Sequence, residues 1–510
     1  MKAKKLSILC AVAILGVSAV SLASCGGGVD NAGEAFQLLT IDDLKAKGTE
    51  SNPIVVDFWH SFGHNISEEL EPLVENFETE MAEQGLYIDV NMTAVGGGYD
   101  GLRERVNLGT RTNDVPTMLL GYPDHFSDYI DNGILLPLDE FVNSTDEEIG
   151  IDKSDFVTSY WNEVEMKDLD GNEIIAGIPF NKSTEIMYYN ASAVDPILKE
   201  LGYGEEVDGS WAWTNPTWDE LATVSQKLRE KVEAAGGYTW TYNKKPNTAT
   251  KTTYPVYIDS GSNFFITTAK QWCTSAEEAA DVYTTADGKV VFKNETALAA
   301  QQYFTEKANQ GIWNIPNKVN QSYGSALMNN LEAFISIGST AGVNNNASPK
   351  YELKCTTVPQ KSYDENSFRA VIQQGTNAAI LSSNSNNYTR LAAWLLIKYL
   401  TNTENTTEFS MSTGYLPVRT SALESQTFTD FLADYNSPFG GVTAKAIVAT
   451  NNERDYFYTD PAFSGSSLVR DRVDTMMISI YCNNKDITEA MSTAYKQLED
   501  YDIECVDRLA

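Results

Sequence analysis

The sequence predicts an α/β protein, organised either as two or more domains or as one large two-lobed unit. Two observations predict this class. From Pro53 onward, short apolar runs alternate with segments whose apolar residues recur at helical spacing, which is typical of a parallel sheet covered by helices. The chain also has 510 residues, more than one hydrophobic core usually organises.

The elements of this pattern follow one another along the chain. The predicted strands are residues 54–59, 86–95 and 116–120, and the predicted helices are residues 41–47, 67–81, 99–108, 218–235, 295–310 and 388–400. Thr217 is placed as the N-cap of the helix that follows it. In a parallel α/β sheet, ligands bind at the carboxyl ends of the strands, so we expect the functional residues there.

The first 28 residues resemble a bacterial lipoprotein signal. Lys2, Lys4 and Lys5 precede an apolar run over residues 6–22, which ends in Leu-Ala-Ser-Cys followed by three glycines. A single membrane anchor is the alternative, but a spanning helix needs roughly 20 apolar residues and does not need this ending. We expect a signal peptide at residues 1–24, a lipidated (palmitate-carrying) Cys25, a tether over residues 25–51, and an extracytoplasmic location at the cell membrane.

The chain is strongly acidic, with a formal charge of −33, and removal of the lysine-rich leader changes this to −36. Nucleic-acid binding needs basic patches that replace counterions, so this charge excludes nucleic acid as a partner. It also opposes binding to anionic lipid, so the lipid on Cys25 has to hold the protein at the membrane. We interpret the acidity as a source of solubility.

The cysteines and histidines predict no metal centre and no cofactor. Cys273, Cys355, Cys482 and Cys505 remain once Cys25 is lipidated, and no CxxC pair occurs. A Cys482–Cys505 disulfide and buried free thiols are both open. His60 and His64 are four residues apart, but Gly63 separates them and no carboxylate follows at a zinc spacing. We find no HExxH, GxSxG or P-loop motif.

Several short segments at predicted strand ends combine aromatic, hydroxyl and glycine residues. They are residues 59–61, 96–99, 122–125, 179–190, 338–340, 374–377 and 413–417. Each alone is more often a plain turn or packing motif. Together they predict a cleft that stacks on a small polar ligand and hydrogen-bonds it.

These segments carry a resemblance to a known family. The chain resembles the extracellular solute-binding proteins of ABC importers for sugars (family 1), and among them the sn-glycerol-3-phosphate-binding type. Trp59-His60-Ser61, the Pro-Phe-Asn-x-Ser-Thr segment from Pro179 with Tyr188-Tyr189-Asn190, and Thr413-Gly414-Tyr415-Leu416-Pro417 match motifs of that type. The chain departs from it by having Pro123 in place of a glutamate, and Tyr254 and Tyr257 near the position of two tryptophans.

The resemblance implies a two-lobed periplasmic-binding-protein-like fold with the ligand in the interlobe cleft. It implies lobe one at residues 52–182 and 338–377, and lobe two at residues 183–337 and 378–510. The implied ligand contacts are Tyr99, Asp124, Ser183, Ser339, Gly375, Tyr415 and Arg470. For Arg470, an ion pair with Asp471 or Asp474 is the alternative to a phosphate contact.

The implied function is capture of glycerol-3-phosphate or a related sugar-like solute and its delivery to a membrane permease. A neutral mono- or oligosaccharide is the alternative ligand, in which case Tyr99, Tyr415 and the Tyr254/Tyr257 region would stack on sugar faces. We expect a monomeric non-enzyme. Because acidic residues are abundant, a surface glycoside hydrolase stays a remote alternative, as does an adhesin or structural lipoprotein.

Overall fold

The computed structural model describes residues 34–207, 209–364, 367–433 and 441–509. The predicted signal peptide, Cys25 and the first part of the tether lie outside the described residues, so they stay predictions. The predicted helix at residues 41–47 is confirmed as α1 (Ile41–Lys47), which begins at a capping box between Thr40 and Asp43.

Ten described strands form one sheet, in the order β12, β11, β13, β6, β15, β3, β1, β2, with β14 paired to β6 and β16 to β15. Their bounds are β1 (Ile54–His60), β2 (Ile88–Ala94), β3 (Met118–Gly121), β6 (Ile178–Asn190), β11 (Val256–Ile258), β12 (Trp313–Asn314), β13 (Ile335–Ser339), β14 (Leu353–Thr356), β15 (Val371–Ile380) and β16 (Phe457–Tyr458). The three strands predicted first, β1, β2 and β3, pair in parallel as expected. β6 pairs antiparallel with β13, β14 and β15, so the sheet is mixed rather than purely parallel.

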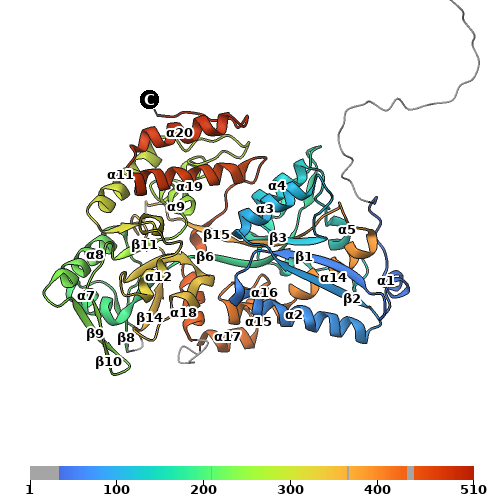
Figure 1. The fold of residues 1–510 in the computed structure, drawn as a ribbon, viewed down its shortest axis with the longest axis horizontal. Coiled ribbons are helices and arrows are strands. Elements are labelled where there is room, and N and C mark those ends of the chain that lie inside the picture. Colours follow the sequence, from blue (N-terminus) through green and yellow to red (C-terminus); the bar gives the residue numbers. More distant parts are fainter. Residues whose placement is uncertain (1–33, 208, 365–366, 434–440, 510) are drawn as a thin grey trace, which may run out of the picture. The chain divides into compact units, whose positions relative to one another are not determined.

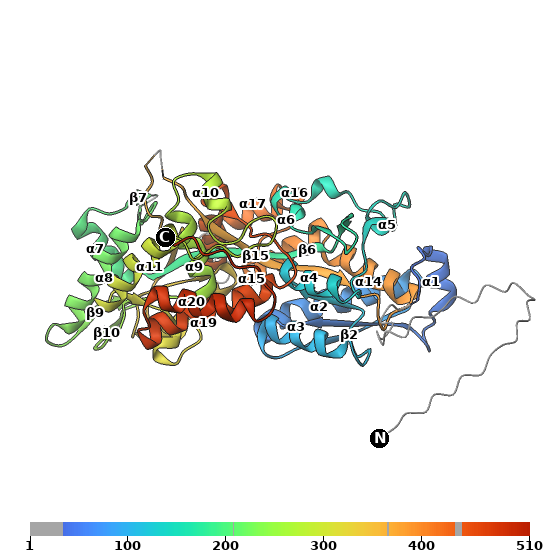
Figure 2. The ribbon, with the colours of Figure 1, turned by 90° about the horizontal axis from the view of Figure 1, so that it is seen from above.

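Helices cover the sheet (Figures 1 and 2). Those predicted from periodicity are α2 (His64–Glu83), α3 (Gly98–Gly109), α8 (Trp218–Glu233), α11 (Glu295–Asn309) and α14 (Asn387–Leu400). Further helices are α4 (Pro123–Asp131), α5 (Asp139–Val142), α6 (Thr158–Asn162), α7 (Ala191–Leu201), α9 (Gly261–Gln271), α10 (Ala276–Ala280), α12 (Gly324–Asn329), α13 (Val343–Asn346), α15 (Thr403–Thr413), α16 (Thr420–Leu423), α17 (Gln426–Ala433), α18 (Gly441–Asn451), α19 (Ser466–Asn483) and α20 (Ile487–Glu499). Three small hairpins pair β4 (Glu165–Lys167) with β5 (Glu173–Ile175), β7 (Glu205–Val207) with β8 (Ser210–Ala212), and β9 (Tyr238–Tyr242) with β10 (Lys245–Ala249).

Two large hydrophobic cores define two lobes. The core of lobe one, at the right of Figure 1, contains buried side chains of β1, β3, α2 and α14. The core of lobe two, at the left, contains those of α8, α9, α11, α19 and α20. Because each lobe has a core of its own, each can move as a unit relative to the other.

The long strands β6 and β15 join the lobes through the centre of the molecule (Figure 1). In β6, Phe180 lies in the core of lobe one and Tyr189 in that of lobe two. β15 runs the opposite way, from Val371 in lobe two to Ile380 in lobe one. The two strands pair antiparallel between these ends, so the connection between the lobes is itself a hydrogen-bonded ladder.

The lobe limits seen in the structure differ from those expected. Residues 338–370 stay with lobe two, because both β13 and β14 pair with the second half of β6 and Val358 lies in the core of lobe two. Residues 378–433 belong with lobe one, since the apolar stripe of α14 packs in its core. We therefore place lobe one at residues 34–182 and 375–433, and lobe two at residues 183–374 and 441–509.

The cysteines of the described residues are unbridged. All four are free thiols: Cys273, Cys355, Cys482 and Cys505. Of the two alternatives, the structure therefore agrees with free thiols, and the Cys482–Cys505 disulfide is absent among these residues. Burial raises the pKa of Cys273 and Cys355 to about 12, which keeps both thiols protonated and unreactive. In the described part of the chain, no helix combines the length and apolarity needed to span a membrane.

Candidate binding cleft

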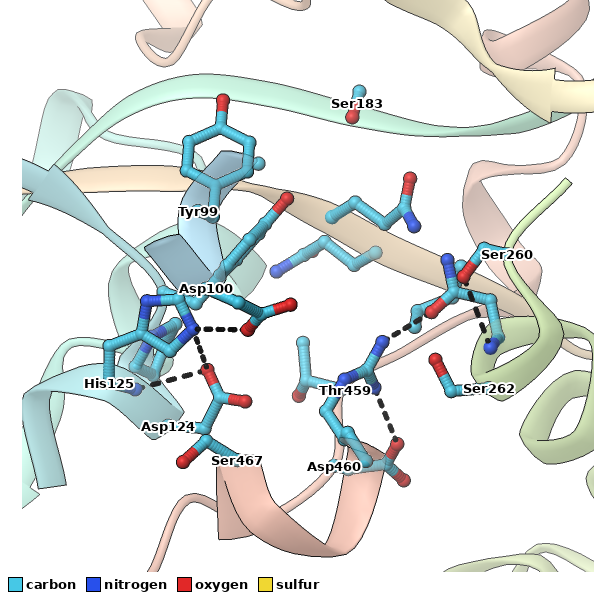
Figure 3. A pocket seen from close by; sticks show the side chains of 18 of the residues that line it. Tyr99, Asp100, Asp124, His125, Ser183, Ser260, Ser262, Thr459, Asp460 and Ser467 are labelled. Atoms are coloured by element: carbon cyan, nitrogen blue, oxygen red, sulfur yellow. Dashed lines mark hydrogen bonds and ion pairs between the residues drawn. The ribbon is translucent and has the colours of Figure 1, made fainter. Parts of the chain in front are cut away.

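A cleft of about 1570 Å³ lies between the lobes. Its walls come from α3 and α4 of lobe one, from α9, α19 and β13 of lobe two, and from the connecting strands β6 and β15. All seven residues predicted as ligand contacts line it: Tyr99, Asp124, Ser183, Ser339, Gly375, Tyr415 and Arg470. Figure 3 shows several of them around one cavity. The topology thus brings together residues that are up to 371 positions apart in the sequence.

Lobe one contributes an aromatic wall. The rings of Tyr99 and Tyr122 lie 4.9 Å apart in an edge-to-face arrangement, and Phe62 lies 6.0 Å from Tyr415. Burial and the neighbouring Tyr415 raise the pKa of Tyr99 well above its ordinary range, so its hydroxyl stays a neutral donor and acceptor. Tyr122 and Phe62, which were not predicted as ligand contacts, belong to segments at strand ends. Such a wall can stack on the apolar face of a sugar ring.

Arg470, on α19, is already engaged by the protein. It donates through Nη2 to Asn263 Oδ1, and its Nη1 lies 4.0 Å from Asp460 Oδ2. Burial lowers the pKa of Arg470, but Asp124, Tyr283 and Asp460 together raise it above its ordinary value. The alternative prediction, an ion pair of Arg470 with Asp471 or Asp474, is wrong. Asp471 pairs with Arg103, and Asp474 accepts backbone hydrogen bonds from Gly261 and Ser262.

Asp124 lies at the start of α4 beside His125. The Asp124 carboxylate is 3.9 Å from His125 Nε2, and Asp100 is 3.7 Å from the same nitrogen (Figure 3). Burial lowers the pKa of His125, which keeps the imidazole neutral near pH 7. The carboxylates of Asp100 and Asp124 both line the cleft, and as hydrogen-bond acceptors they suit hydroxyl donors of a ligand.

Two buried acids line the other side of the cleft. Burial raises the pKa of Glu185, on β6, to about 8 and that of Asp259 to about 7. Asn263 Nδ2 donates to Glu185 Oε1 (3.0 Å), and Gly324 N donates to Asp259 Oδ1 (2.8 Å). Glu185 is consequently protonated over much of the neutral range, so it can donate as well as accept a hydrogen bond.

Gly375 and the two predicted serines have local roles besides lining the cleft. Gly375 has φ +104°, and a Cβ there would overlap the carbonyl oxygen of Asn181 and lie 2.6 Å from Lys182 Cα. Only glycine lets β15 approach β6 so closely. Ser339 caps the turn after β13, where its Oγ accepts from Ala341 N (3.3 Å), and Ser183 lies on β6 opposite Gln374.

A buried polar network under the cleft escaped the sequence analysis. Lys182 is fully buried and donates to Glu163 and to Asn377 Oδ1 (2.8 Å). Gln373 Nε2 donates to Glu163 Oε2 (2.7 Å), which ties α6 to both connecting strands. Lys182 lies within the Pro-Phe-Asn-x-Ser-Thr segment at the variable position. Its partner Glu163 has no motif around it, so the sequence holds no signal for the pair.

Three residues expected near the ligand lie elsewhere. Tyr257 is buried in a core cluster of lobe two, and Tyr254 lines a separate cavity of about 320 Å³. Neither belongs to the lining of the cleft, so the expectation that they stack on a ligand there is wrong. Trp59 is buried under Arg105, whose guanidinium lies 4.0 Å from the ring centre.

The comparison with protein families decides the class. Residues 73–434 match the model of the bacterial extracellular solute-binding proteins. The chain belongs to this family. No curated protein sequence matches it significantly.

Solved structures of binding proteins share the fold of this solute-binding protein. UgpB from Mycobacterium tuberculosis in complex with glycerophosphocholine has 18% identity and a TM-score of 0.65, over 87% of this chain and 97% of that one. The GacH receptor of Streptomyces glaucescens has 14% identity and a TM-score of 0.64, over 88% and 98%. MalE from Bdellovibrio bacteriovorus bound to maltotriose has 16% identity and a TM-score of 0.63, over 88% and 100%. At such identities the likeness is one of fold, and it confirms the predicted two-lobed α/β architecture.

The cleft of this solute-binding protein is negatively charged. Its described lining has eleven carboxylate side chains, namely Asp100, Asp124, Asp131, Glu163, Glu165, Asp168, Glu185, Asp259, Asp460, Asp471 and Asp474. The lysine and arginine side chains of that lining are Lys167 and Arg470. The described residues contain no group of three or more His, Cys, Asp or Glu side chains arranged to hold a metal ion. His60 is buried and accepts from Phe62 N (3.2 Å), while His64 is exposed beside Glu68.

Proposed function

We propose that this protein is the solute-capturing component of an ABC importer. It acts outside the cell membrane, held there by a lipid on Cys25, and delivers its solute to a membrane permease without chemical change. The ligand is a neutral carbohydrate larger than a monosaccharide. The observation that carries this proposal is the interlobe cleft, in which an aromatic wall faces hydroxyl, amide and carboxylate groups of both lobes.

The size of the cleft supports an extended ligand. Sites for small molecules commonly have volumes of about 300–1,000 Å³, and this cleft measures about 1570 Å³. Glycerol-3-phosphate would leave most of it to water. An oligosaccharide would fill it and could stack on Tyr99, Tyr122 and Tyr415 along the wall of lobe one.

The charge of the cleft supports a neutral ligand. A phosphate dianion would enter a cleft whose acidic side chains outnumber its lysine and arginine side chains, and it would have to compete with Asn263 and Asp460 for the guanidinium of Arg470. Neutral hydroxyls avoid this repulsion, and the carboxylates Asp100 and Asp124 can accept hydrogen bonds from them.

A phosphodiester such as glycerophosphocholine is the second candidate, favoured by Arg470. The side chain sits on a rigid helix inside the cleft, and the Pro-Phe-Asn-x-Ser-Thr segment resembles that of the glycerol-phosphate-binding type. UgpB of Mycobacterium tuberculosis, which has the same fold, was solved with glycerophosphocholine. A zwitterion has no net charge, so the acidic cleft opposes it less than it opposes glycerol-3-phosphate.

Calorimetric titration separates the two candidates. The probes are neutral trisaccharides (maltotriose, cellotriose and chitotriose), glycerophosphocholine and glycerol-3-phosphate. We expect a trisaccharide to bind with Kd of about 1 µM, or about −8 kcal/mol. Arg470→Ala should weaken this binding tenfold or less, because Arg470 then only orients Asn263. The control Arg472→Ala removes the same charge from α19 outside the cleft lining.

Two outcomes would overturn the carbohydrate proposal. In the first, a phosphate ester binds and no trisaccharide does. Arg470→Ala then weakens the affinity for that ester more than about a hundredfold, and Arg472→Ala does not. The other is turnover of a chromogenic glycoside, which would make the protein a hydrolase. Small-angle scattering tests the transport role: a bound ligand should reduce the radius of gyration, and an unchanged value contradicts lobe closure.

A further inference from the structure

An ion pair joins the two lobes beside the cleft. Arg103 on α3 of lobe one donates through Nη2 to Asp471 Oδ2 on α19 of lobe two, at 2.8 Å. The Arg103 side chain is only 9% exposed and that of Asp471 is 32% exposed. Pairs shielded to this degree are stronger than fully exposed surface pairs, because water and salt screen them less.

A second contact lies next to this pair. Ser127 Oγ, on α4 of lobe one, is 2.9 Å from the carbonyl oxygen of Phe463, in the loop that precedes α19. Both contacts therefore join the α3–α4 region to the start of α19, on the side of the cleft where Asp100 and Asp124 lie (Figure 3).

Arg103 itself is not part of the cleft lining, whereas Asp100 and Asp471 are. The guanidinium lies among carboxylates of both lobes: Asp471 of lobe two at 2.8 Å and Asp100 of lobe one at 4.0 Å, with Asp128 also close enough to affect its pKa. Without this cation, Asp100 and Asp471 would face each other across the gap and repel.

We propose that Arg103, from outside the cleft lining, pairs with Asp471 to form an interlobe latch that sets the ligand affinity of the cleft. The pair exists only where α3 and α19 meet, so it stabilises the closed arrangement and not the open one. Ligand affinity rises with the fraction of molecules already closed, because less of the binding free energy is then used for closure. Arg103 is thus a positioning residue. This consequence for affinity rests on the proposed function, whereas the latch itself does not.

The first test needs no ligand. Small-angle scattering compares the wild type with Arg103→Ala and Arg103→Met, of which the second keeps an unbranched apolar stem. We expect both variants to have a larger radius of gyration than the wild type. The matched control is Arg105→Ala, which removes the same charge from the same helix but has its guanidinium over Trp59, within lobe one. Thermal unfolding checks that each variant is folded.

The second test uses the ligand that binds in the calorimetric screen. We expect Arg103→Ala to weaken binding about tenfold and Arg105→Ala to leave it unchanged. Asp471→Asn, which keeps the shape of the side chain, should open the lobes as Arg103→Ala does. Arg103→Lys, which keeps the positive charge among these carboxylates, should stay closer to the wild type in radius of gyration than Arg103→Met, which a purely local packing role of Arg103 would not predict.

The outcomes separate the latch from the proposed function. The latch proposal is overturned if the folded variants keep the radius of gyration of the wild type. This applies to Arg103→Ala, Arg103→Met and Asp471→Asn. Opening of the ligand-free variants while no probe binds the wild type supports the latch and refutes the carbohydrate proposal. Opening without any loss of affinity refutes the link between closure and binding.

Discussion

At the level of single residues, burial controls the chemistry of the cleft more than residue type does. Glu185 and Asp259 are acids whose pKa values, about 8 and about 7, are raised by burial. They are therefore hydrogen-bonding groups of variable charge. Burial also raises the pKa of Asp100, which lies 3.7 Å from the Nε2 of a neutral His125.

Glu185 makes stability depend on pH. Its folded-state pKa of about 8 exceeds the ordinary value of 4.5, so the folded protein keeps a proton that the unfolded chain releases. Stability is therefore lost as pH rises from about 4.5 to about 8, at up to about 1.4 kcal/mol per pH unit for such a group. We expect Glu185→Gln to lower the steepness of this loss, measured by chemical denaturation from pH 5 to 8.

The control for that prediction is Asp152→Asn. Hydrogen bonds from Ser154 lower the pKa of Asp152, so this exposed acid titrates below the tested pH range. Asp152→Asn should therefore change the free energy of unfolding by the same amount at every pH tested. An unchanged pH slope in Glu185→Gln would show that Glu185 is already ionised in the folded protein.

At the level of elements, the two connecting strands depend on one glycine. A methyl group at Gly375 would overlap the backbone of β6, and φ is +104° there. We expect Gly375→Ala to reduce the free energy of unfolding by more than about 4 kcal/mol, because both the strained dihedral and the strand separation oppose folding. Chemical denaturation measures this change.

Gly171, in the turn between β4 and β5, provides the matched comparison. It also has positive φ, +83°, but a Cβ there meets no atom within 4 Å. Gly171→Ala should therefore reduce the free energy of unfolding only by the cost of the positive φ, about 1–2 kcal/mol. Equal effects at the two glycines would mean that β6 and β15 can separate freely at Gly375.

At the level of the whole molecule, the net charge of −33 opposes compactness. Carboxylates of one lobe repel those of the other, and salt screens this repulsion between charges farther apart than the Debye length, which is about 10 Å at 0.1 M. We expect the melting temperature to rise between 20 and 300 mM NaCl, as measured by calorimetry. A falling melting temperature would mean that ion pairs such as Arg103–Asp471 outweigh the general repulsion.

Local sequence patterns are enough to predict many of the helices and strands and the kinds of residue that line the cleft. The helices α2, α3, α8, α11 and α14 and the first three strands follow from apolar periodicity, which depends only on neighbouring residues. All seven ligand contacts implied by the family resemblance line the cleft. Their contact with a ligand stays a prediction.

The tertiary structure alone decided which segments share a lobe and which charges meet. Residues 338–370 and α14 lie in lobes other than those expected, because strand pairing with β6 and packing against β1 join segments far apart in the chain. The partners Arg470–Asp460, Lys182–Glu163 and Arg103–Asp471 are equally invisible in sequence. Coulomb interactions depend on distance in space, and separation along the chain does not predict it.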